Sequence, residues 1–161
     1  MISYSTTTSS IKEENERRLT KDFSIFQNKQ LGKGGFGQIF LGRNIRENTL
    51  IAIKVEEQIQ RSHLTMEYQI LKEIQGGDGI PRVYDLHNGR KHNYLIMQLL
   101  GKSLDKLFID TNRHFSIKTV SQIAYQMVQR IEYVHSRGYI HRDIKPGNFL
   151  LVKILTIKLY F

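Results

Sequence analysis

The chain of 161 residues contains no cysteine, which excludes disulfides and zinc sites built on thiolates. Its six histidines show no close pairing of the kind that metal sites use. It also lacks an apolar run long enough to cross a membrane. The first ten residues are rich in hydroxyl groups and contain no apolar signal core. These absences indicate an intracellular protein, in the cytoplasm, the nucleus or both.

The chain has few acidic residues: 15 Asp and Glu against 24 Lys and Arg, which gives a net charge of +9. Such an excess suits nucleic acid, an anionic membrane or acidic substrates as partners. The basic residues are scattered along the chain, and no nucleic-acid-binding motif accompanies them. We therefore expect neither nucleic acid nor a membrane as the partner.

The first 21 residues are predicted to form a disordered tail. A run of Ser and Thr at 5–10 shows no apolar periodicity, which is typical of disordered segments. The charged run at 12–18 is interpreted as a short helical lead-in. The folded part is expected to begin near Phe23, where apolar residues start to recur.

A glycine-rich motif lies between two β-favouring segments, 23–31 and 38–41, and reads Gly32-Lys33-Gly34-Gly35-Phe36-Gly37. The spacing G-x-G-x-x-G also occurs in dinucleotide-binding proteins, but there the turn opens a helix, whereas residues 39–42 favour a strand. An ordinary glycine-rich hairpin is the other alternative. A glycine loop between strands lets backbone N–H groups approach phosphate oxygens.

An apolar strand predicted at 50–55 carries Lys54 near its end. Burying an unpaired ammonium is unfavourable, so Lys54 needs an anionic partner unless it reaches solvent at the strand end. A helix predicted over 62–75 offers Glu67, with Glu57 and Glu73 as competing partners. Glu67 is preferred because it lies inside the helix.

The second half of the chain is predicted to be mainly helical. After a rigid turn at 76–81 and paired strands at 83–86 and 94–97, helices are expected over 103–108 and 116–135. Ser116 can cap the longer helix, and Gly138 ends it. Its apolar residues recur at steps of three and four and are interpreted as core: Val120, Ile123, Ala124, Met127, Val128, Ile131 and Val134.

A polar loop follows this helix and carries Asp143, Lys145 and Asn148 between apolar flanks. Phosphoryl transfer to an alcohol needs these three side chains. A carboxylate orients the hydroxyl and accepts its proton, a cation steadies the phosphoryl group, and an amide oxygen helps to hold magnesium.

The spacing His-Arg-Asp-Ile-x-x-x-Asn resembles the catalytic loop of protein kinases, and the glycine loop, strand lysine and helix glutamate precede it in kinase order. The resemblance covers about 23–151. It is closest to the casein kinase I group, in four motifs: Gly76-Gly77-x-Gly79-Ile80-Pro81, Leu99-Leu100-Gly101-x-Ser103-Leu104, Phe115-Ser116-x-Lys118-Thr119-Val120 and Gln126-Met127-x-x-Arg130-Ile131-Glu132-Tyr133-x-His135-Ser136.

This resemblance implies an α+β fold. A kinase-like small lobe of antiparallel sheet plus one helix is expected at 22–97. A hinge at 98–101 and an incomplete, mainly helical large lobe at 102–161 follow. The implied activity is ATP-dependent phosphorylation of Ser and Thr hydroxyls on proteins, with acidic or pre-phosphorylated substrates among the candidates.

The resemblance also implies the site residues. Asp143 is the expected base, Lys145 meets the γ-phosphate, and Asn148 binds Mg²⁺. The residues expected to bind ATP are Leu31, Gly32, Lys33, Gly34, Gly35, Phe36, Gly37, Ile39, Ala52, Lys54, Glu67, Met97, Gln98 and Leu100.

The sequence departs from the group at its end, since the segment 156–159 resembles the strand before Asp-Phe-Gly but no such motif follows. No Asp or Glu occurs after Asp143. The chain is therefore expected to be truncated, weakly active or inactive, and poorly soluble alone. The alternative is a non-catalytic module that binds nucleotide or a protein partner. Gln98 and Gly147 are milder departures, because an acidic residue is usual at both positions.

Overall fold

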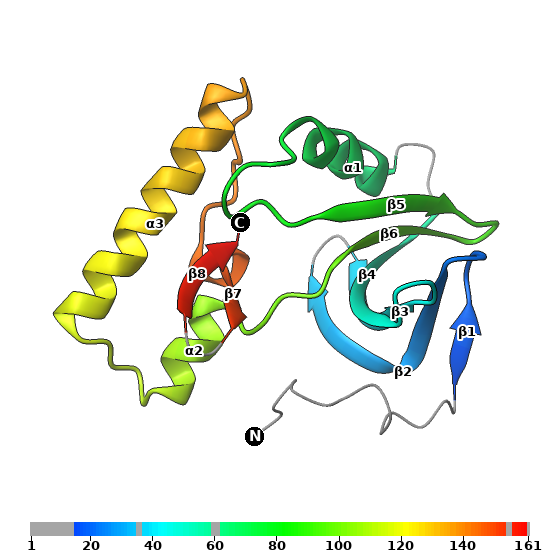
Figure 1. Ribbon diagram of the computed structural model, residues 1–161, viewed down its shortest axis with the longest axis horizontal. Coiled ribbons are helices and arrows are strands. Elements are labelled where there is room, and N and C mark those ends of the chain that lie inside the picture. The colour runs from blue at the N-terminus through cyan, green and yellow to red at the C-terminus, as the bar shows by residue number, and fades with distance from the viewer. Residues whose placement is uncertain (1–14, 35–36, 59–61, 154–155, 161) are drawn as a thin grey trace. The chain divides into compact units, whose positions relative to one another are not determined.

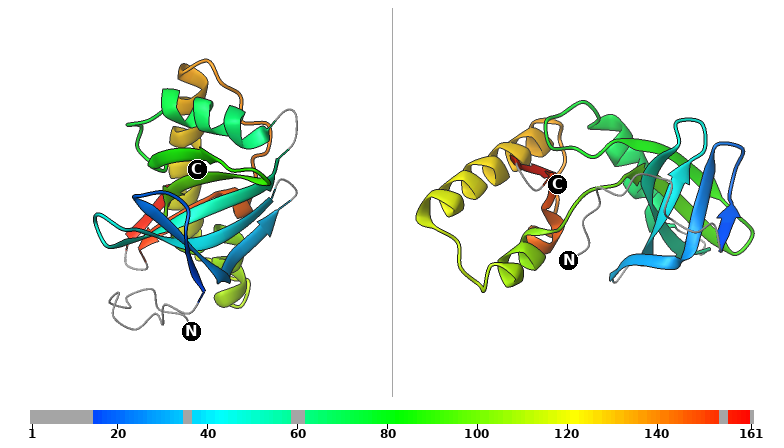
Figure 2. Two further views of the ribbon diagram at one scale, coloured as in Figure 1. Left: turned by 90° about the vertical axis from the view of Figure 1, so that its right-hand side faces the viewer. Right: turned by 60° about the horizontal axis from the view of Figure 1, so that its bottom comes forward.

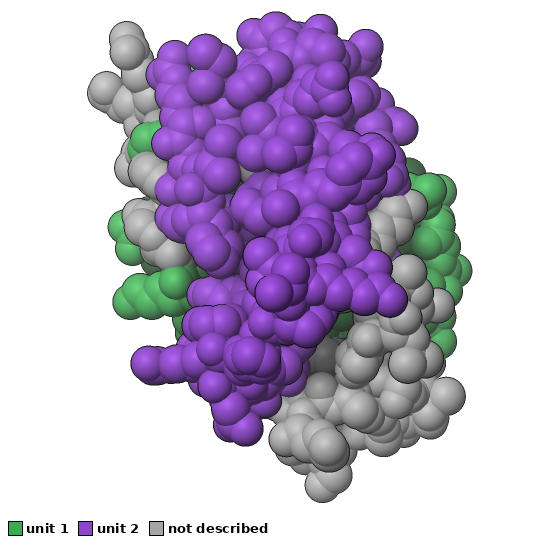
Figure 3. Space-filling model, turned by 90° about the vertical axis from the view of Figure 1, so that its left-hand side faces the viewer, with its two compact units in different colours: residues 1–73, 82–99 green, residues 74–81, 100–161 purple. Residues whose placement is uncertain are grey.

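The computed structural model describes residues 15–34, 37–58, 62–153 and 156–160 (Figure 1). The chain forms two compact units, one from residues 1–73 and 82–99 and the other from 74–81 and 100–161 (Figure 3). The segment 74–81 thus belongs to the second unit, although its sequence neighbours on both sides belong to the first. The first unit is therefore built from two separate stretches of chain.

The first unit is a curled six-stranded antiparallel sheet with one helix (Figure 2). The strand order is β1-β2-β3-β4-β6-β5. Helix α1 (His63–Glu73) contacts β5 and β6. The strands are β1 (Glu16–Arg18), β2 (Phe23–Gly34), β3 (Gly37–Asn44), β4 (Thr49–Glu57), β5 (Val83–Asn88) and β6 (His92–Gln98). The predicted sheet and its single helix are confirmed.

Alternate residues of β6 belong to two separate apolar clusters, and β4 contributes to one of them. Ile51, Ile53 and Ile96 are fully buried in one cluster together with residues of β2. Leu64 of α1 and Leu95 of β6 are fully buried in the other. Side chains alternate between the faces of a strand, and full burial of one such residue stabilises by about 1.5–3 kcal/mol. These contacts fix α1 against one face of the sheet.

The N-terminal segment differs from the prediction of a helical lead-in within a disordered tail. Residues 1–14 lie outside the described part, but Glu16–Arg18 forms β1 and pairs with β2 in register with Phe26, Ile25 and Ser24. Arg17 donates a hydrogen bond to the Tyr94 hydroxyl at 2.8 Å, and its guanidinium lies over the same ring. Edge pairing and this side-chain contact outweigh the helix preference of a short charged run.

The second unit contains two helices, a short 3₁₀ turn and a two-stranded sheet. Its buried centre includes Leu104, Ile123, Phe149 and Leu151. The elements are α2 (Leu104–Asp110), α3 (Ile117–Ser136), η2 (Pro146–Asn148), β7 (Leu150–Lys153) and β8 (Thr156–Tyr160). The predicted helical large-lobe fragment is confirmed.

Helix α3 shows that the expected apolar stripe is only partly core. Ile123 and Val134 are buried, as expected, whereas Ala124 is exposed and Val120 and Val128 are 50% and 63% exposed. Helix α3 therefore has more apolar surface than α2, η2 and the two-stranded sheet bury. Its ends follow the prediction: the Ser116 hydroxyl accepts from the Thr119 N–H, and Gly138 follows with φ +83°.

The segment 74–81 is bound to α3 by polar contacts and close packing. Arg130 is 4% exposed and donates to Asp78 at 2.7 Å. The Tyr133 hydroxyl donates to the Ile74 carbonyl at 3.0 Å, and Gly77 lies directly against the Tyr133 ring. In the described part of the chain, no helix is both long enough and apolar enough to span a membrane.

Candidate active site

The described residues of the glycine motif form the end of β2 and the start of β3. Gly34 pairs with Gly37 in register, and Gly32 pairs with Ile39. Gly35 and Phe36 lie outside the described residues. Gly37 has φ +133°, and a Cβ there would lie 2.3 Å from the Val55 carbonyl oxygen, so this position accepts only glycine. The bare backbone of such a turn is suited to close approach by an anion.

Lys54 forms an ion pair with the predicted partner. Its Nζ lies 2.6 Å from Glu67 Oε2, and the two side chains are 20% and 34% exposed. Lys54 of β4 faces Ile39 and Leu95 in the neighbouring strands, while Glu67 comes from the middle of α1. The contact of Lys54 with Glu67, in preference to Glu57, is confirmed. Its exposure leaves the ammonium accessible to a phosphate.

The expected adenine contacts lie along β4 and β6. Ala52 is buried and pairs with half-buried Met97. The Gln98 N–H donates to the Arg82 carbonyl at 2.8 Å, and the Arg82 N–H donates to Gln98 Oε1 at 3.1 Å. Because the Gln98 N–H already donates to Arg82, the contact with adenine that is predicted for Gln98 would use its carbonyl oxygen. The adenine contacts themselves stay a prediction.

The loop of the second unit that is predicted to be catalytic has an unusual backbone conformation at Arg142. Arg142, immediately before Asp143, has φ +66°, which is uncommon for a residue with a side chain. The Asp143 N–H donates to His141 Nδ1 at 3.2 Å. The loop therefore bends just before Asp143, whose side chain is 56% exposed.

Asp143, Lys145 and Asn148 converge on one carboxylate. Lys145 Nζ donates to both oxygens of Asp143, at 2.9 and 2.7 Å. Asn148 Nδ2 donates to Asp143 Oδ2 at 3.0 Å and to the Asp143 carbonyl at 2.7 Å. The hydrogen bond from Lys145, and after it that from Asn148, lowers the pKa of Asp143 below its ordinary value of 3.8. The carboxylate is therefore ionised at neutral pH.

Backbone pairing fixes the far side of this loop. Phe149 is fully buried, and its carbonyl accepts from the Leu104 N–H at 2.9 Å. The Gly101 N–H donates to Leu151 O at 2.7 Å, and the Leu151 N–H donates to Lys102 O at 2.9 Å. The segment after the predicted hinge is thus paired with the segment after Asn148. The sequence carried no signal for this pairing beyond one aromatic residue at the end of a polar loop.

Asn148 fits a magnesium ion only in part. Its amide nitrogen is used on Asp143, which leaves the amide oxygen for a cation. Among the described residues, no group of three or more His, Cys, Asp or Glu side chains gathers at a possible metal site. Mg²⁺ is normally bound through one or two carboxylates together with phosphate oxygens and water. Among the side chains predicted as site residues, Asn148 thus offers a magnesium ion one neutral oxygen.

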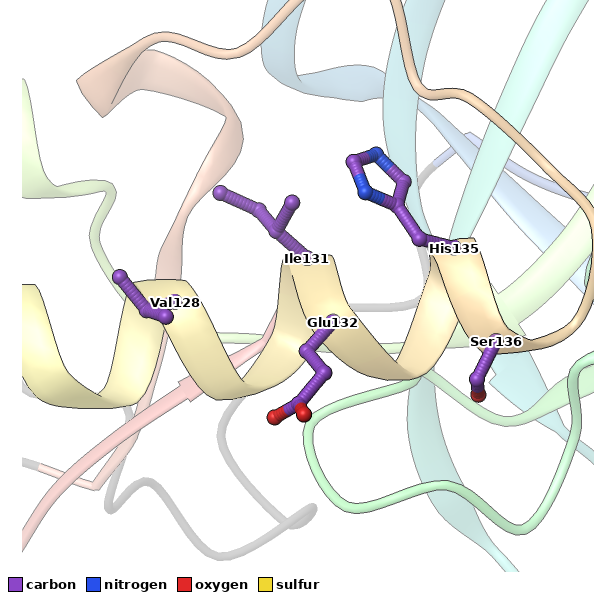
Figure 4. Close-up of a pocket in the computed structure, with 5 residues that line it drawn as sticks. All are labelled: Val128, Ile131, Glu132, His135 and Ser136. Carbon is purple, nitrogen blue, oxygen red and sulfur yellow. The ribbon is translucent and has the colours of Figure 1, made fainter.

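The side chains of α3 line an open depression of about 430 Å³ (Figure 4). Val128, Ile131, Glu132, His135 and Ser136 lie along successive turns of this one helix. None of them was predicted as a site residue. The depression belongs to the exposed side of the apolar stripe and holds none of the catalytic side chains.

Comparison with known proteins agrees with these features. A family model described as a protein kinase domain matches residues 25–160. A curated protein of Encephalitozoon cuniculi, described as "Probable casein kinase I homolog", is 41% identical over 126 residues. The aligned part is 76% of this chain and 41% of that relative, so the chain spans about two fifths of the relative's length.

Proposed function

Because this chain belongs to the protein kinase family, we propose that it binds ATP with Mg²⁺ and transfers the γ-phosphoryl group to Ser or Thr hydroxyls of proteins. Similarity to a casein kinase I homolog supports the choice of Ser and Thr. The observation that carries the proposal is the convergence of Lys145 and Asn148 on the Asp143 carboxylate.

In this proposal the first unit binds the nucleotide. Lys54 contacts the α- and β-phosphates while Glu67 holds its ammonium in place. The glycine turn covers the phosphates with backbone N–H groups. The adenine ring is bounded by Ala52, Met97 and the other apolar residues of the predicted set in this unit, and it donates a hydrogen bond to the carbonyl of Gln98.

The second unit supplies the groups that act on the acceptor hydroxyl. Ionised Asp143 accepts a hydrogen bond from that hydroxyl and aims its oxygen at the γ-phosphorus. As the new P–O bond forms, the bond to the bridging oxygen of ADP breaks, and the hydroxyl proton passes through Asp143 to solvent. An arriving phosphate competes with Asp143 for Lys145, so Lys145 moves to the phosphoryl group when the nucleotide binds.

Asn148 would hold a magnesium ion through its amide oxygen. When bound, Mg²⁺ neutralises part of the phosphate charge. The other role of Asn148 needs no ion, because its Nδ2 hydrogen bonds orient the Asp143 carboxylate.

Acidic protein segments are the proposed substrates, because the chain carries a net charge of +9. An intracellular location, cytoplasmic or nuclear, is part of this proposal, since ATP is the phosphoryl donor. A peptide series in which acidic residues around one Ser are replaced by Gln or Asn tests the preference. Equal rates across the series would contradict it.

Nucleotide binding is tested by calorimetric titration of ATP and Mg²⁺ into the wild type and Lys54→Met. A hydrogen bond to a charged group is worth about 1.5–3 kcal/mol, so the variant should bind about 10- to 150-fold more weakly. Lys72→Met, which removes an exposed lysine of α1, is the matched control and should bind as the wild type does. Equal affinity of wild type and Lys54→Met would remove Lys54 from the site.

Phosphoryl transfer is tested with radiolabelled ATP and casein, and with Asp143→Asn as the control. General-base catalysis contributes about 10²–10⁴-fold, so the variant should lose at least 99% of the rate. Equal incorporation in both proteins would contradict the role of Asp143. Binding of ATP without any transfer by the wild type would favour the non-catalytic module.

A further inference from the structure

Glu56 is a buried carboxylate that the proposed catalytic machinery does not use. Its side chain is 8% exposed, and it lies on β4 two residues after Lys54. Residues two apart on a strand point to the same face, so Lys54 and Glu56 both project from the face opposite to buried Ile53 and half-buried Val55. A buried charge needs hydrogen-bond or ionic partners, and the partners of Glu56 indicate its structural role.

The Glu56 carboxylate accepts hydrogen bonds from the start of α1. The His63 N–H donates to Oε1 at 3.1 Å, the Leu64 N–H to Oε2 at 3.5 Å, and the Ser62 hydroxyl to Oε2 at 2.6 Å. The Thr65 N–H donates in turn to Ser62 Oγ at 3.3 Å. The first N–H groups of a helix have no partner within it, and this end of the helix dipole favours an anion. Glu56 and Ser62 together satisfy the first three.

The ionisation of Glu56 agrees with this geometry. Burial alone would raise the pKa of Glu56, but the hydrogen bonds from Ser62, His63 and Leu64 outweigh it and hold the pKa below 4.5. The His63 ring contributes as well, with Nδ1 at 3.0 Å from Oε1. The charged form is therefore the one that these contacts stabilise.

Two polar contacts join β4 to α1. Glu56 of β4 meets His63 at the start of α1, and Lys54 of β4 meets Glu67, one turn further along α1. The apolar packing of Leu64 and Leu95 holds α1 close to the sheet, but such packing has no direction. Hydrogen bonds at the helix start do have a direction and oppose sliding or rotation of α1.

We propose that Glu56 is a positioning residue that fixes the start of α1 and thereby keeps the Glu67 carboxylate on Lys54. The importance of this for phosphate binding rests on the function proposed above, whereas the coupling of Glu56 to the Lys54–Glu67 pair does not. An intact chain can test the two separately.

The experiment measures the rate at which acetic anhydride labels Lys54, followed by mass spectrometry, with and without ATP and Mg²⁺. A lysine nitrogen held by a carboxylate has to leave that contact before it attacks the reagent. Without nucleotide, Glu56→Gln should label about two- to thirtyfold faster than the wild type, the range that corresponds to loss of a helix cap. Glu67→Gln should also label faster, and combining the two substitutions should add nothing further. Glu57→Gln, on the exposed end of β4, should label as the wild type does.

Two outcomes would overturn the proposal. A wild-type rate in Glu56→Gln, beside a raised rate in Glu67→Gln, would overturn it. So would effects that multiply in the double variant, because a general loss of stability acts alike in both backgrounds. Ser62→Ala removes one hydrogen bond to the same carboxylate and should raise the rate in the same direction if Glu56→Gln does not fold. Failure of ATP to protect Lys54 of the wild type would contradict the proposed function and leave the coupling result intact.

Discussion

Substituting Gly77 by alanine should destabilise the second unit, because the new methyl group would collide with a ring that cannot easily move. A Cβ at Gly77 would lie 2.1 Å from Cε1 of Tyr133 and 2.3 Å from its Cζ. Carbon atoms in contact are normally about 3.5–4.0 Å apart, so the ring has to shift by more than 1 Å. The ring is held by its hydroxyl, which donates to the Ile74 carbonyl, and by Arg137, which lies over its face.

The expected magnitude follows from three contributions. Overpacking costs about 1–3 kcal/mol, and loss of the hydroxyl's hydrogen bond adds about 1 kcal/mol. Alanine offsets about 0.4–1 kcal/mol by restricting the unfolded chain, because Gly77 does not have a positive φ. The net loss of unfolding free energy is about 1–3.6 kcal/mol. For a chain of this size the melting temperature should fall by about 2–14 °C.

Thermal unfolding followed by circular dichroism provides the measurement. Gly147→Ala is the control in the same unit, because its Cβ would meet Asp105 at an ordinary 3.5 Å, and it should melt within about 1 °C of the wild type. The penalty of Gly77→Ala should also shrink when Tyr133 is replaced by alanine. A Gly77→Ala protein that melts as the wild type does, or an equal penalty in both backgrounds, would refute the steric argument.

Three further predictions follow from other residues. Gly37→Ala should lower both stability and ATP affinity in thermal melts and titrations, because its Cβ would lie 2.3 Å from the Val55 carbonyl oxygen; unchanged values would contradict a glycine-only position. Because the pKa of Glu56 is lowered in the folded state, ionised Glu56 stabilises the fold fully above about pH 4.5, and this stabilisation is lost as the pH falls through the folded-state pKa. In urea denaturation between neutral pH and about pH 3, the free energy of unfolding should therefore fall more steeply with pH for the wild type than for Glu56→Gln. Parallel curves would exclude this source of acid sensitivity. Val128→Lys should reduce self-association in sedimentation velocity without lowering the melting temperature, because Val128 is 63% exposed. Ile123→Lys is the contrasting variant and should unfold the second unit, because Ile123 is only 7% exposed.

The elements with strong local signals could be predicted from the sequence. The apolar run at 50–55 became β4, and the helix from Ser116 to Gly138 has the cap and the glycine end that its sequence indicates. The pairing of Lys54 with Glu67 was also predicted, because a lysine on a buried strand needs an anionic partner and Glu67 lies inside the predicted helix. In each of these cases a local pattern and the global packing require the same structure.

Contacts between distant residues with ordinary local sequence could not be predicted. β1 contains three charged residues and forms a strand only because β2 and Tyr94 are available to it. Glu56 resembles any charged residue near a strand end, and its signal was the alternation with Lys54 together with a serine cap six residues later. Exposure of Val128 depends on how much of α3 its neighbours cover, which helical periodicity does not specify.

The placement of segment 74–81 in the second unit has a consequence for synthesis on the ribosome. By the time Gln98 has emerged, every strand of the first sheet exists, and that sheet can close. The hydrogen bond from Arg130 to Asp78, however, cannot form until Arg130 has been synthesised, 52 residues after Asp78 and 32 residues after Gln98. At about 5–20 residues per second, synthesis of those last 32 residues takes roughly 2–6 seconds. During that time the nascent chain carries a folded sheet whose loop 74–81 does not yet contact α3, and chaperones or proteases would meet it in that form.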